Sequence, residues 1–233
     1  MKNPSLIDVH NHILFGVDDG AQTLEDSLNM LRFAKDQGYE ALVLTPHLFS
    51  SATRAKRETH LKHFEALKEA AKDIDLTLFL GGEIKYKSHI DIDYDQYAFG
   101  PYKTILLEFS TYADAPIDDV CYTLIKKGYQ VVVAHVERYN SYVDLEGYQR
   151  IKETGALLQV NATSIVGYEA KLHKKIIKKL LKYGLIDIIG TDAHNLDERK
   201  PDLLSSYRVL EKKIDSEYLD QLYYENAKKL LFK

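Results

Sequence analysis

The stretch DVHNHILFGVDDG (residues 8–20) follows directly on the apolar pair Leu6 and Ile7. Two histidines and three aspartates thus stand beside a short apolar run, where an unpaired charge is costly to bury. An ordinary surface loop is one explanation for them. A strand end that carries metal ligands is the other.

Short apolar runs rich in β-branched residues recur along the chain, each followed by a longer stretch with helical periodicity. This alternation predicts parallel strands joined by helices, and seven such runs favour an α/β barrel. Thr23 is expected to cap a helix that ends at Gly38. The segment 86–102 lacks a clear helical pattern and is expected to form an excursion over one face. The seven runs are residues 6–10, 41–47, 76–83, 104–109, 130–135, 156–161 and 186–194.

The composition is typical of a globular protein. The chain has 233 residues, 45% hydrophobic and 28% charged, and no linker divides it, so a single domain over 1–233 is predicted. A formal net charge of −4 argues against nucleic acid as the main partner, because phosphate backbones attract basic proteins. Cys121 is the only cysteine, which excludes an intramolecular disulfide and favours a reducing, cytoplasmic location. No apolar stretch is long enough to span a bilayer, so we expect no stable membrane insertion.

Histidines and acidic residues gather at the ends of the predicted strands. In a parallel barrel these ends meet on one face, where barrel active sites are built. Imidazole and carboxylate suit zinc, manganese and iron, and a set without cysteine favours the metals that prefer oxygen. A single strand-end histidine is more often structural, but the coincidence of five of the nine histidines favours a metal site. The residues concerned are His10, His12, His47, Glu83, Glu108, His135, Asp192 and His194.

A carboxylate such as Glu83 can bridge two ions through its two oxygens. Paired ions about 3.5 to 4 Å apart clamp the attacking and leaving oxygens of a phosphoryl transfer. The pattern therefore predicts a multinuclear hydrolase site. No ligand role is expected for the histidines on predicted helices or in the excursion, which are His60, His63, His89 and His173.

The motifs DVHNH, TPH, GGE, LLEF, AHVER and TDAH occur in this order along the chain. Together they resemble the PHP (polymerase and histidinol phosphatase) superfamily. The longer strings HILFGVDDG, AHVERY and TDAHN are similar to its protein-tyrosine phosphatase branch, which is encoded with bacterial capsule and exopolysaccharide genes. The resemblance covers nearly the whole chain, although Val136 stands where many members have proline.

This resemblance implies a distorted seven-stranded (β/α)7 TIM-like barrel with three divalent metal ions, manganese being expected and iron or zinc the alternatives. Asp18 is the alternative to Asp19 as a ligand, because a shift of one residue exchanges them. Arg138 and Arg199 correspond to positions near the substrate phosphate, which guanidinium binds through two oxygens at once; exposed surface arginines are the alternative. By position, the ions would be held by His10, His12, Glu83 and Asp192, by Glu83, Glu108 and His135, and by Asp19, His47 and His194.

The implied activity is metal-dependent hydrolysis of phosphotyrosine in proteins, with the tail of a cognate bacterial tyrosine kinase as partner. A cysteine mechanism is disfavoured, because Cys121 lies on a predicted helix and Lys127 stands where an arginine would close the anion-binding loop. A small-molecule phosphoesterase of histidinol-phosphatase type is the main alternative. A metal-dependent exonuclease, disfavoured by the acidic balance, and a non-catalytic metal protein that docks on a kinase are the others.

The basic segment KLHKKIIKKLLKYG (171–184) allows two explanations. Its apolar residues have helical spacing, which favours a helix with one core face and one solvated lysine face. Attraction of an acidic tail or of a membrane surface is the alternative.

Overall fold

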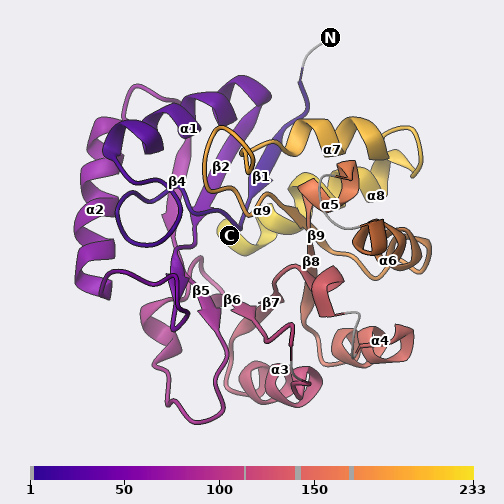
Figure 1. The fold of residues 1–233 in the computed structure, drawn as a ribbon. Coiled ribbons are helices and arrows are strands. Elements are labelled where there is room, and N and C mark those ends of the chain that lie inside the picture. Colours follow the sequence, from indigo (N-terminus) through magenta and orange to yellow (C-terminus); the bar gives the residue numbers. More distant parts are fainter. Residues whose placement is uncertain (1–2, 113, 140–142, 168–170) are drawn as a thin grey trace.

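The structure is a computed structural model and describes residues 3–112, 114–139, 143–167 and 171–233. Strands occupy the centre of the molecule and helices surround them (Figure 1). All pairings between the strands of the described residues are parallel, and helices lie between most successive strands. The predicted α/β class is therefore confirmed.

The strands form two sheets, one with the order β1, β2, β4 and the other with the order β3, β5, β6, β7, β8, β9. The larger sheet curves as a half-barrel (Figure 1). Each of the predicted runs contains strand residues. The bounds are β1 Leu6–Asp8, β2 Tyr39–Leu44, β3 His47–Leu48, β4 Thr77–Leu80, β5 Glu83–Lys85, β6 Thr104–Glu108, β7 Gln130–Val133, β8 Leu157–Asn161 and β9 Ile188–Gly190.

Two of the predicted runs are broken, so the described residues hold nine strand segments rather than seven. Pro46 interrupts the second run because proline has no N–H for the ladder, and the pair Gly81 and Gly82 interrupts the third. A hydrogen bond from Glu83 N to Pro46 O (3.0 Å) continues the pairing past both breaks. His47 and Glu83 consequently begin β3 and β5, instead of ending strands as expected, and the two residues are partners in register.

The first and last strands are joined just beyond their ends. Asp192 N donates to His10 O (2.8 Å), and His12 N donates to Ala193 O (2.8 Å). A parallel bridge between Asn11 and Ala193 lies between these bonds. Strands β1 and β9 are therefore neighbours, as a barrel requires, while a closed seven-stranded barrel stays a prediction.

The helices follow the strands as the periodicity predicted. Thr23 and Asp26 cap each other's backbone at the start of α1, and Gly38 ends this helix with a φ of 102°. None of the helices in the described ranges is both long and apolar enough to cross a membrane. The bounds are α1 Leu24–Gln37, α2 Arg57–Ala70, α3 Ile117–Lys126, α4 Leu145–Glu153, α5 Ala162–Val166, α6 Lys171–Lys182, α7 Leu203–Leu210, α8 Ser216–Asp220 and α9 Asn226–Leu231, with the short helices η1 Tyr94–Gln96, η2 Val136–Tyr139 and η3 Gln221–Glu225.

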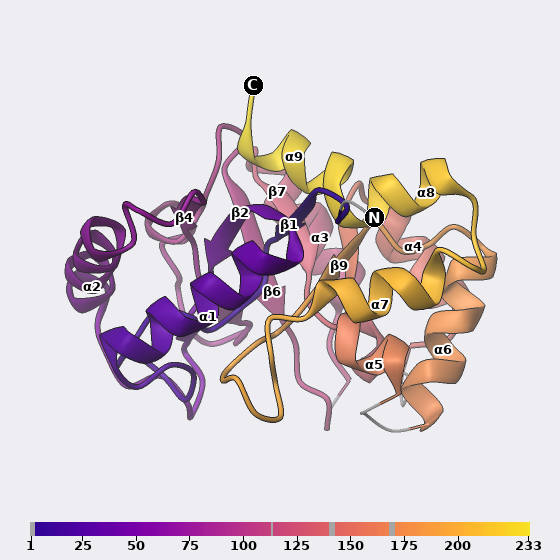
Figure 2. The same ribbon diagram turned by 90° about the horizontal axis from the view of Figure 1, so that it is seen from above.

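Alternate strand residues pack on opposite sides of the sheets. One set, which includes Ile7 and Val43, packs against Leu230 of α9 and against Phe99 from the excursion. The other set packs against the surrounding helices. Figure 2 shows α9 and the C-terminus along one side of the strands. Gly81 makes room for Phe99, because a Cβ at this position would lie 2.7 Å from the Phe99 ring.

Asp8 ties β1 to the end of β9. Its buried carboxylate accepts hydrogen bonds from Thr191 Oγ1 (2.5 Å), Thr191 N (3.2 Å), His10 N (3.1 Å) and Asn11 Nδ2 (3.3 Å). Burial raises the pKa of Asp8, while these bonds oppose the rise. The side chain therefore fixes the two strand ends that carry His10 and Asp192.

Replacement of Asp8 by alanine is expected to lower the free energy of unfolding by roughly 2–4 kcal/mol, because several buried donors lose their acceptor. Thr191→Val, which removes one of these donors, should cost about 1 kcal/mol. Urea unfolding followed by circular dichroism measures both changes. Equal unfolding midpoints for the wild type and Asp8→Ala would contradict this role.

Candidate metal centre

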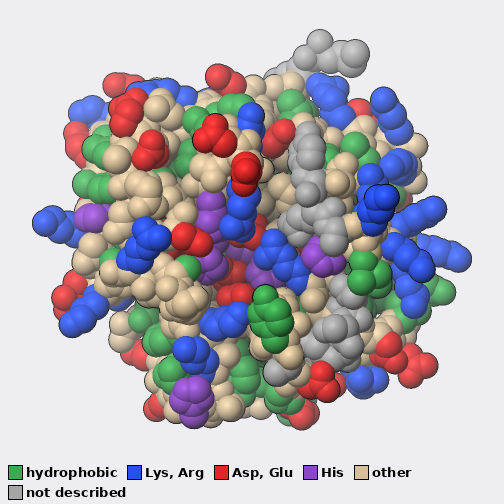
Figure 3. Space-filling model, viewed as in Figure 1, with side chains coloured by type: hydrophobic (Ala, Val, Ile, Leu, Met, Phe, Trp, Pro, Cys, Tyr) green, Lys and Arg blue, Asp and Glu red, His purple; other side chains and the backbone are tan. Residues whose placement is uncertain are grey.

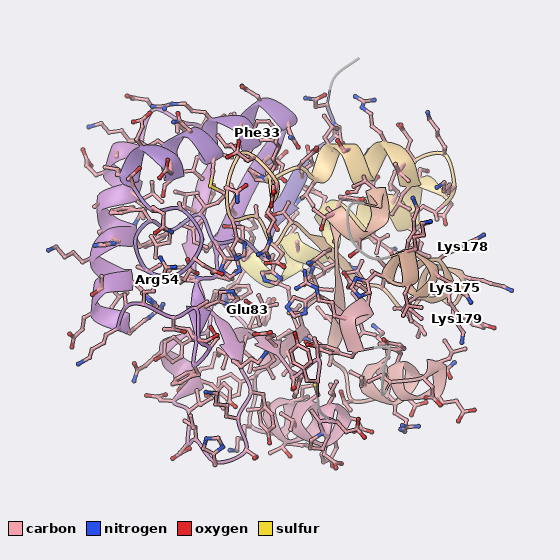
Figure 4. The ribbon with its side chains drawn as sticks, viewed as in Figure 1. Phe33, Arg54, Glu83, Lys175, Lys178 and Lys179 are labelled. Atoms are coloured by element: carbon pink, nitrogen blue, oxygen red, sulfur yellow. The ribbon has the colours of Figure 1, made fainter. Side chains whose placement is uncertain are left out.

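All nine predicted ligands lie together where the strand ends meet. They fall into overlapping groups, and within each group the candidate ligand atoms lie within 4.8 Å of one another. Figure 3 shows histidine and acidic side chains in a hollow at the centre of one face, and Figure 4 places Glu83 there. The groups are His12, Asp19, His47 and His194; His10, His12 and Glu83; His10, His135 and Asp192; and His47, Glu83 and Glu108.

Glu83 lies at the centre of the cluster and is buried. Its Oε1 is 2.9 Å from His135 Nε2 and 3.3 Å from His10 Nε2, and its Oε2 is 2.6 Å from His47 Nδ1. Burial favours the neutral acid, but His10 and His47 hold the pKa of Glu83 well below its usual range. The carboxylate is therefore ionised and faces several imidazoles.

The pKa values of two of these imidazoles are raised by the neighbouring carboxylates. Burial disfavours the charged ring of His10, but Glu83 and Asp192 outweigh burial and raise its pKa to about 9. His47 is affected in the same way: Glu83 overcomes burial and raises its pKa to about 9. Without a metal ion, protons thus supply the positive charge that the carboxylates require.

Asp192 joins the cluster to both predicted arginines. Its Oδ1 is 2.6 Å from Arg199 Nη2 and 3.3 Å from His12 Nε2, and its Oδ2 is 3.2 Å from Arg138 Nη2. Burial raises the pKa of Asp192, but Arg199 and His10 hold it well below the usual range. The two guanidinium groups consequently lie at the edge of the cluster, where an anion would approach.

The two neighbouring aspartates have different surroundings. Asp19 Oδ1 lies 3.4 Å from His194 Nε2 and 3.5 Å from His47 Nε2, and the proximity of the His194 imidazole lowers the pKa of Asp19. Asp18 instead accepts from the Nδ1 of His12 (2.8 Å) and from the backbone N of His47 (2.9 Å). Of the two side chains, only Asp19 belongs to a candidate metal group. The loop approaches His12 closely, and a Cβ on Gly20 would collide with the His12 carbonyl.

The backbone turns sharply at two residues of the site. His135 has a φ of 35° and Asp192 a φ of 55°, both in the left-handed region that non-glycine residues seldom adopt. Each lies two residues after the end of a buried strand, His135 after β7 and Asp192 after β9. Such conformations concentrate at functional sites, where the surrounding structure holds them.

Several residues that orient the cluster escaped the sequence analysis. Gln159 Oε1 is 2.9 Å from His10 Nδ1 and accepts from His135 N (2.9 Å), and Asn161 donates to Asp192 Oδ2 (2.9 Å). Such partners fix the imidazole orientation in metal sites. The available signal was the presence of Gln159 and Asn161 in an otherwise apolar strand. Lys85 also went unnoticed, and its Nζ lies 2.6 Å from Glu108 Oε1.

The inward-facing atoms of the cluster fit a cation. Several buried nitrogens and one carboxylate oxygen have no hydrogen-bond partner among the described residues, although carboxylates and imidazoles face one another there. Buried polar atoms are normally satisfied, so these atoms indicate a missing ligand. Imidazole and carboxylate together are metal ligands, and the clusters are able to bind metal. The atoms are His10 Nε2, His12 Nε2, His47 Nδ1, Glu83 Oε2 and His194 Nε2.

Cys121 and the four other histidines lie outside the candidate metal groups of the described residues. Cys121 is buried in α3, and burial raises the pKa of its thiol to about 12, so it is no thiolate nucleophile at neutral pH. Of the four histidines, His63 has its Nδ1 2.9 Å from Phe15 O.

A parallel α/β fold with clustered histidines and carboxylates at its strand ends, flanked by two arginines, is the arrangement of a metal-dependent hydrolase. The sequence matches the profile described as Capsular polysaccharide synthesis, CpsB/CapC, over residues 6–232. The chain belongs to this family, and the resemblance inferred from its motifs is confirmed.

Similar proteins agree with this assignment. The tyrosine-protein phosphatase CpsB of Streptococcus agalactiae serotype III is 32% identical over 97% of this chain and 98% of its own length. The tyrosine-protein phosphatase YwqE of Bacillus subtilis is 32% identical over 97% of this chain and 91% of its own length. A solved structure from work on YwqE of Bacillus subtilis and CpsB of Streptococcus pneumoniae, described as metal-dependent tyrosine phosphatases, has a TM-score of 0.87 and 30% identity, covering 97% of this chain and 94% of that chain. These relatives are of the enzyme class that the motifs predicted.

Uptake of a divalent ion by the metal-free protein is expected to release protons at about pH 7.5, because the pKa values of His10 and His47 are raised to about 9. Each displaced proton weakens the apparent metal affinity about tenfold per pH unit as the pH falls below that pKa. Competition with a chromophoric chelator measures the affinity, and an indicator in weak buffer measures the protons. An affinity that stays constant between about pH 6.5 and 8.5 would contradict this expectation.

Proposed function

We propose that this chain is a metal-dependent protein-tyrosine phosphatase that hydrolyses phosphotyrosine in proteins. The observation that carries the proposal is the cluster of imidazoles and carboxylates with Arg138 and Arg199 at its edge. A phosphate ester requires cations to neutralise its oxygens and donors to orient it, and this site offers both. The names of the similar proteins point to the same substrate.

Three divalent ions, with manganese the expected metal, form part of this proposal. The overlap of the candidate groups through Glu83 and through His12 supports more than one ion, because bridging carboxylates are typical of multinuclear sites. Iron and zinc remain the alternatives, since the ligand types suit all three metals. The proposed ligands are His10, His12, Glu83 and Asp192 for one ion, Glu83, Glu108 and His135 for the second, and Asp19, His47 and His194 for the third.

When bound, the ions would supply Lewis acidity toward phosphate oxygens and a stronger water nucleophile at neutral pH. Arg138 and Arg199 stay charged at every physiological pH and are suited to hold the phosphate by two oxygens each. Both now contact Asp192, so they are already directed at the cluster. Phenolate is a good leaving group, so departure of tyrosine makes little demand on a general acid.

The proposed partner is the phosphotyrosine-bearing tail of a bacterial tyrosine kinase in capsule or exopolysaccharide synthesis. The family description, which names capsular polysaccharide synthesis, supports this setting. A cytoplasmic location is proposed because Cys121 is unpaired and suits a reducing compartment. If β2 with β3 and β4 with β5 count as interrupted strands, the fold is a distorted seven-stranded barrel, which the hydrogen bonds between β1 and β9 support.

Protein loaded with manganese is expected to release phosphate from a phosphotyrosine peptide, and EDTA should abolish the release. His135→Ala should lower kcat/KM at least about 100-fold, because it removes a proposed ligand. The matched control is Cys121→Ala, which should stay within about twofold of the wild type, since the thiol is buried away from the cluster. Loss of activity in Cys121→Ala with persistence in EDTA would refute the metal mechanism. Faster hydrolysis of histidinol phosphate than of the peptide would favour the small-molecule alternative.

Asp18→Asn is expected to weaken metal binding roughly 10- to 100-fold, because Asp18 fixes the ring of His12 and the backbone of His47. The exposed Asp36→Asn is the charge-matched control and should leave the affinity unchanged. Chelator competition measures affinity, and circular dichroism verifies the fold. An Asp18→Asn protein with wild-type metal affinity would show that Asp18 does not position the cluster.

A further inference from the structure

Helix α6 carries six lysines and no acidic residue in its 12 positions. Lysines three or four positions apart share a side of the helix, and like charges at this spacing destabilise it. Lys171 and Lys174 also lie in the first turn, where the helix dipole disfavours positive charge. The charge pattern of α6 thus disfavours the helix itself, in a chain whose net charge is −4. Positions at which the sequence works against local stability are commonly functional.

The lysines of α6 are exposed, and no ion pair joins them to a carboxylate of the described residues. Among the residues that the structure describes, the ion pairs formed by lysines involve other positions, such as Lys35, Lys85 and Lys152. Figure 4 shows Lys175, Lys178 and Lys179 projecting outward from α6. Figure 3 shows basic side chains at the same edge of the face that holds the histidines. The positive charge of α6 is therefore available to an external anion.

A groove of about 880 Å³ lies beside this helix, between α6 and the segment that joins α7 to α8. Its apolar floor includes Ile177, Leu181 and Ile214. The lysines at its rim are Lys174, Lys178, Lys182 and Lys213. We call the site formed by these floor and rim residues the α6 groove. The acidic residue in its wall, Asp215, is engaged in capping α8, where it accepts from Tyr218 N (2.8 Å).

The α6 groove is connected to the metal centre by short elements. Ile165 of α5 lines the groove, and Asn161, four residues earlier, donates to Asp192. Four residues of helix span about 6 Å. Helix α6 also packs against η2, which carries Arg138. Because α6 packs against η2, we expect a chain that places a phosphate at Arg138 to reach the groove with residues only a few positions away.

We propose that the α6 groove docks an acidic segment of the protein that carries the phosphotyrosine. This inference rests on the proposed function. It adds that the protein substrate has an acidic segment close to its phosphotyrosine. The lysines would attract several carboxylates through a field that the acidic remainder of the chain does not offer. The apolar floor would bury one or two aromatic or aliphatic side chains of the same segment.

A peptide fits this surface better than a lipid bilayer does. The apolar residues Ile177 and Leu181 lie on the floor of a groove below the lysines, and Ile177 is 3% exposed. A flat bilayer would meet the lysine heads and leave the groove unfilled, whereas an extended chain can enter it. An extended segment of about six residues, at roughly 3.3 Å each, matches the length of a 12-residue helix.

The test compares two fluorescent phosphotyrosine peptides that differ in a run of about six glutamates or six glutamines beyond a short spacer, placed on either side of the phosphotyrosine. At low salt the glutamate peptide is expected to have about tenfold lower KM, an advantage that falls as salt screens the charges. The variant Lys174→Gln/Lys178→Gln/Lys182→Gln should lose this advantage and keep wild-type kinetics on 4-nitrophenyl phosphate. Glutamine preserves helix propensity, and circular dichroism verifies the fold.

The control variant Lys62→Gln/Lys68→Gln/Lys72→Gln changes the net charge equally on the exposed side of α2 and its end, and should retain the advantage. Fluorescence anisotropy with the unphosphorylated glutamate peptide measures docking without catalysis, so absence of hydrolysis would count against the proposed function alone. Equal KM values for both peptides in the wild type, or equal losses in both variants, would overturn the docking proposal. So would lysine-dependent sedimentation with phosphatidylglycerol vesicles in the absence of peptide binding.

Discussion

The fully buried carboxylate of Glu83 is the constraint on which the rest of the structure depends. An ionised carboxylate away from water is tolerated only when positive charge surrounds it. His10 and His47, whose pKa values are raised, provide this charge, and His135 contacts the same carboxylate, so the residues after β1 and β7 and the first residue of β3 must converge around β5. Parallel strands deliver this convergence, because their carboxyl ends share one side of the sheet. The position of the site thus depends on the fold, because only converging strands bring the imidazoles around the Glu83 carboxylate.

Most of the strands could be predicted because they are buried on both sides and therefore read as nearly continuous apolar runs, although β4 is only partly buried. The positions at which two of the strands are interrupted could not be predicted in this way. Pro46 reveals a missing donor, but only the structure shows that Glu83 N resumes the ladder on Pro46 O. Gly81 gives a weaker signal still, because its small size is required by Phe99, which comes from a distant part of the sequence. Local pattern therefore identifies elements, whereas non-local packing decides where they break.

Most of the metal cluster could be predicted as a set because its members lie at or shortly after the end of a strand; His47 and Glu83 instead begin strands, and Asp19 lies in the loop after β1. The partners that orient them do not share a position. Asp18 differs from Asp19 only in the direction of its side chain, which the turn before Gly20 determines. Gln159 bonds both His10 and His135 from the middle of a strand. Residue type and spacing predict ligands, while the orientation of each ring depends on contacts across the sheet.

The packing of α9 against the inner sides of the strands has a consequence for how the protein is made. Leu230 and Leu231 cover Ile7 and Val43, although synthesis separates them by most of the chain. The residues of β1 therefore leave the ribosome long before the segment that shields them from water. Contacts between distant parts of a sequence form slowly, and unshielded strands are prone to aggregate in the interval. His10 likewise contacts Asp192 from the far end of the sequence, so the cluster is completed only after residue 192 has been synthesised.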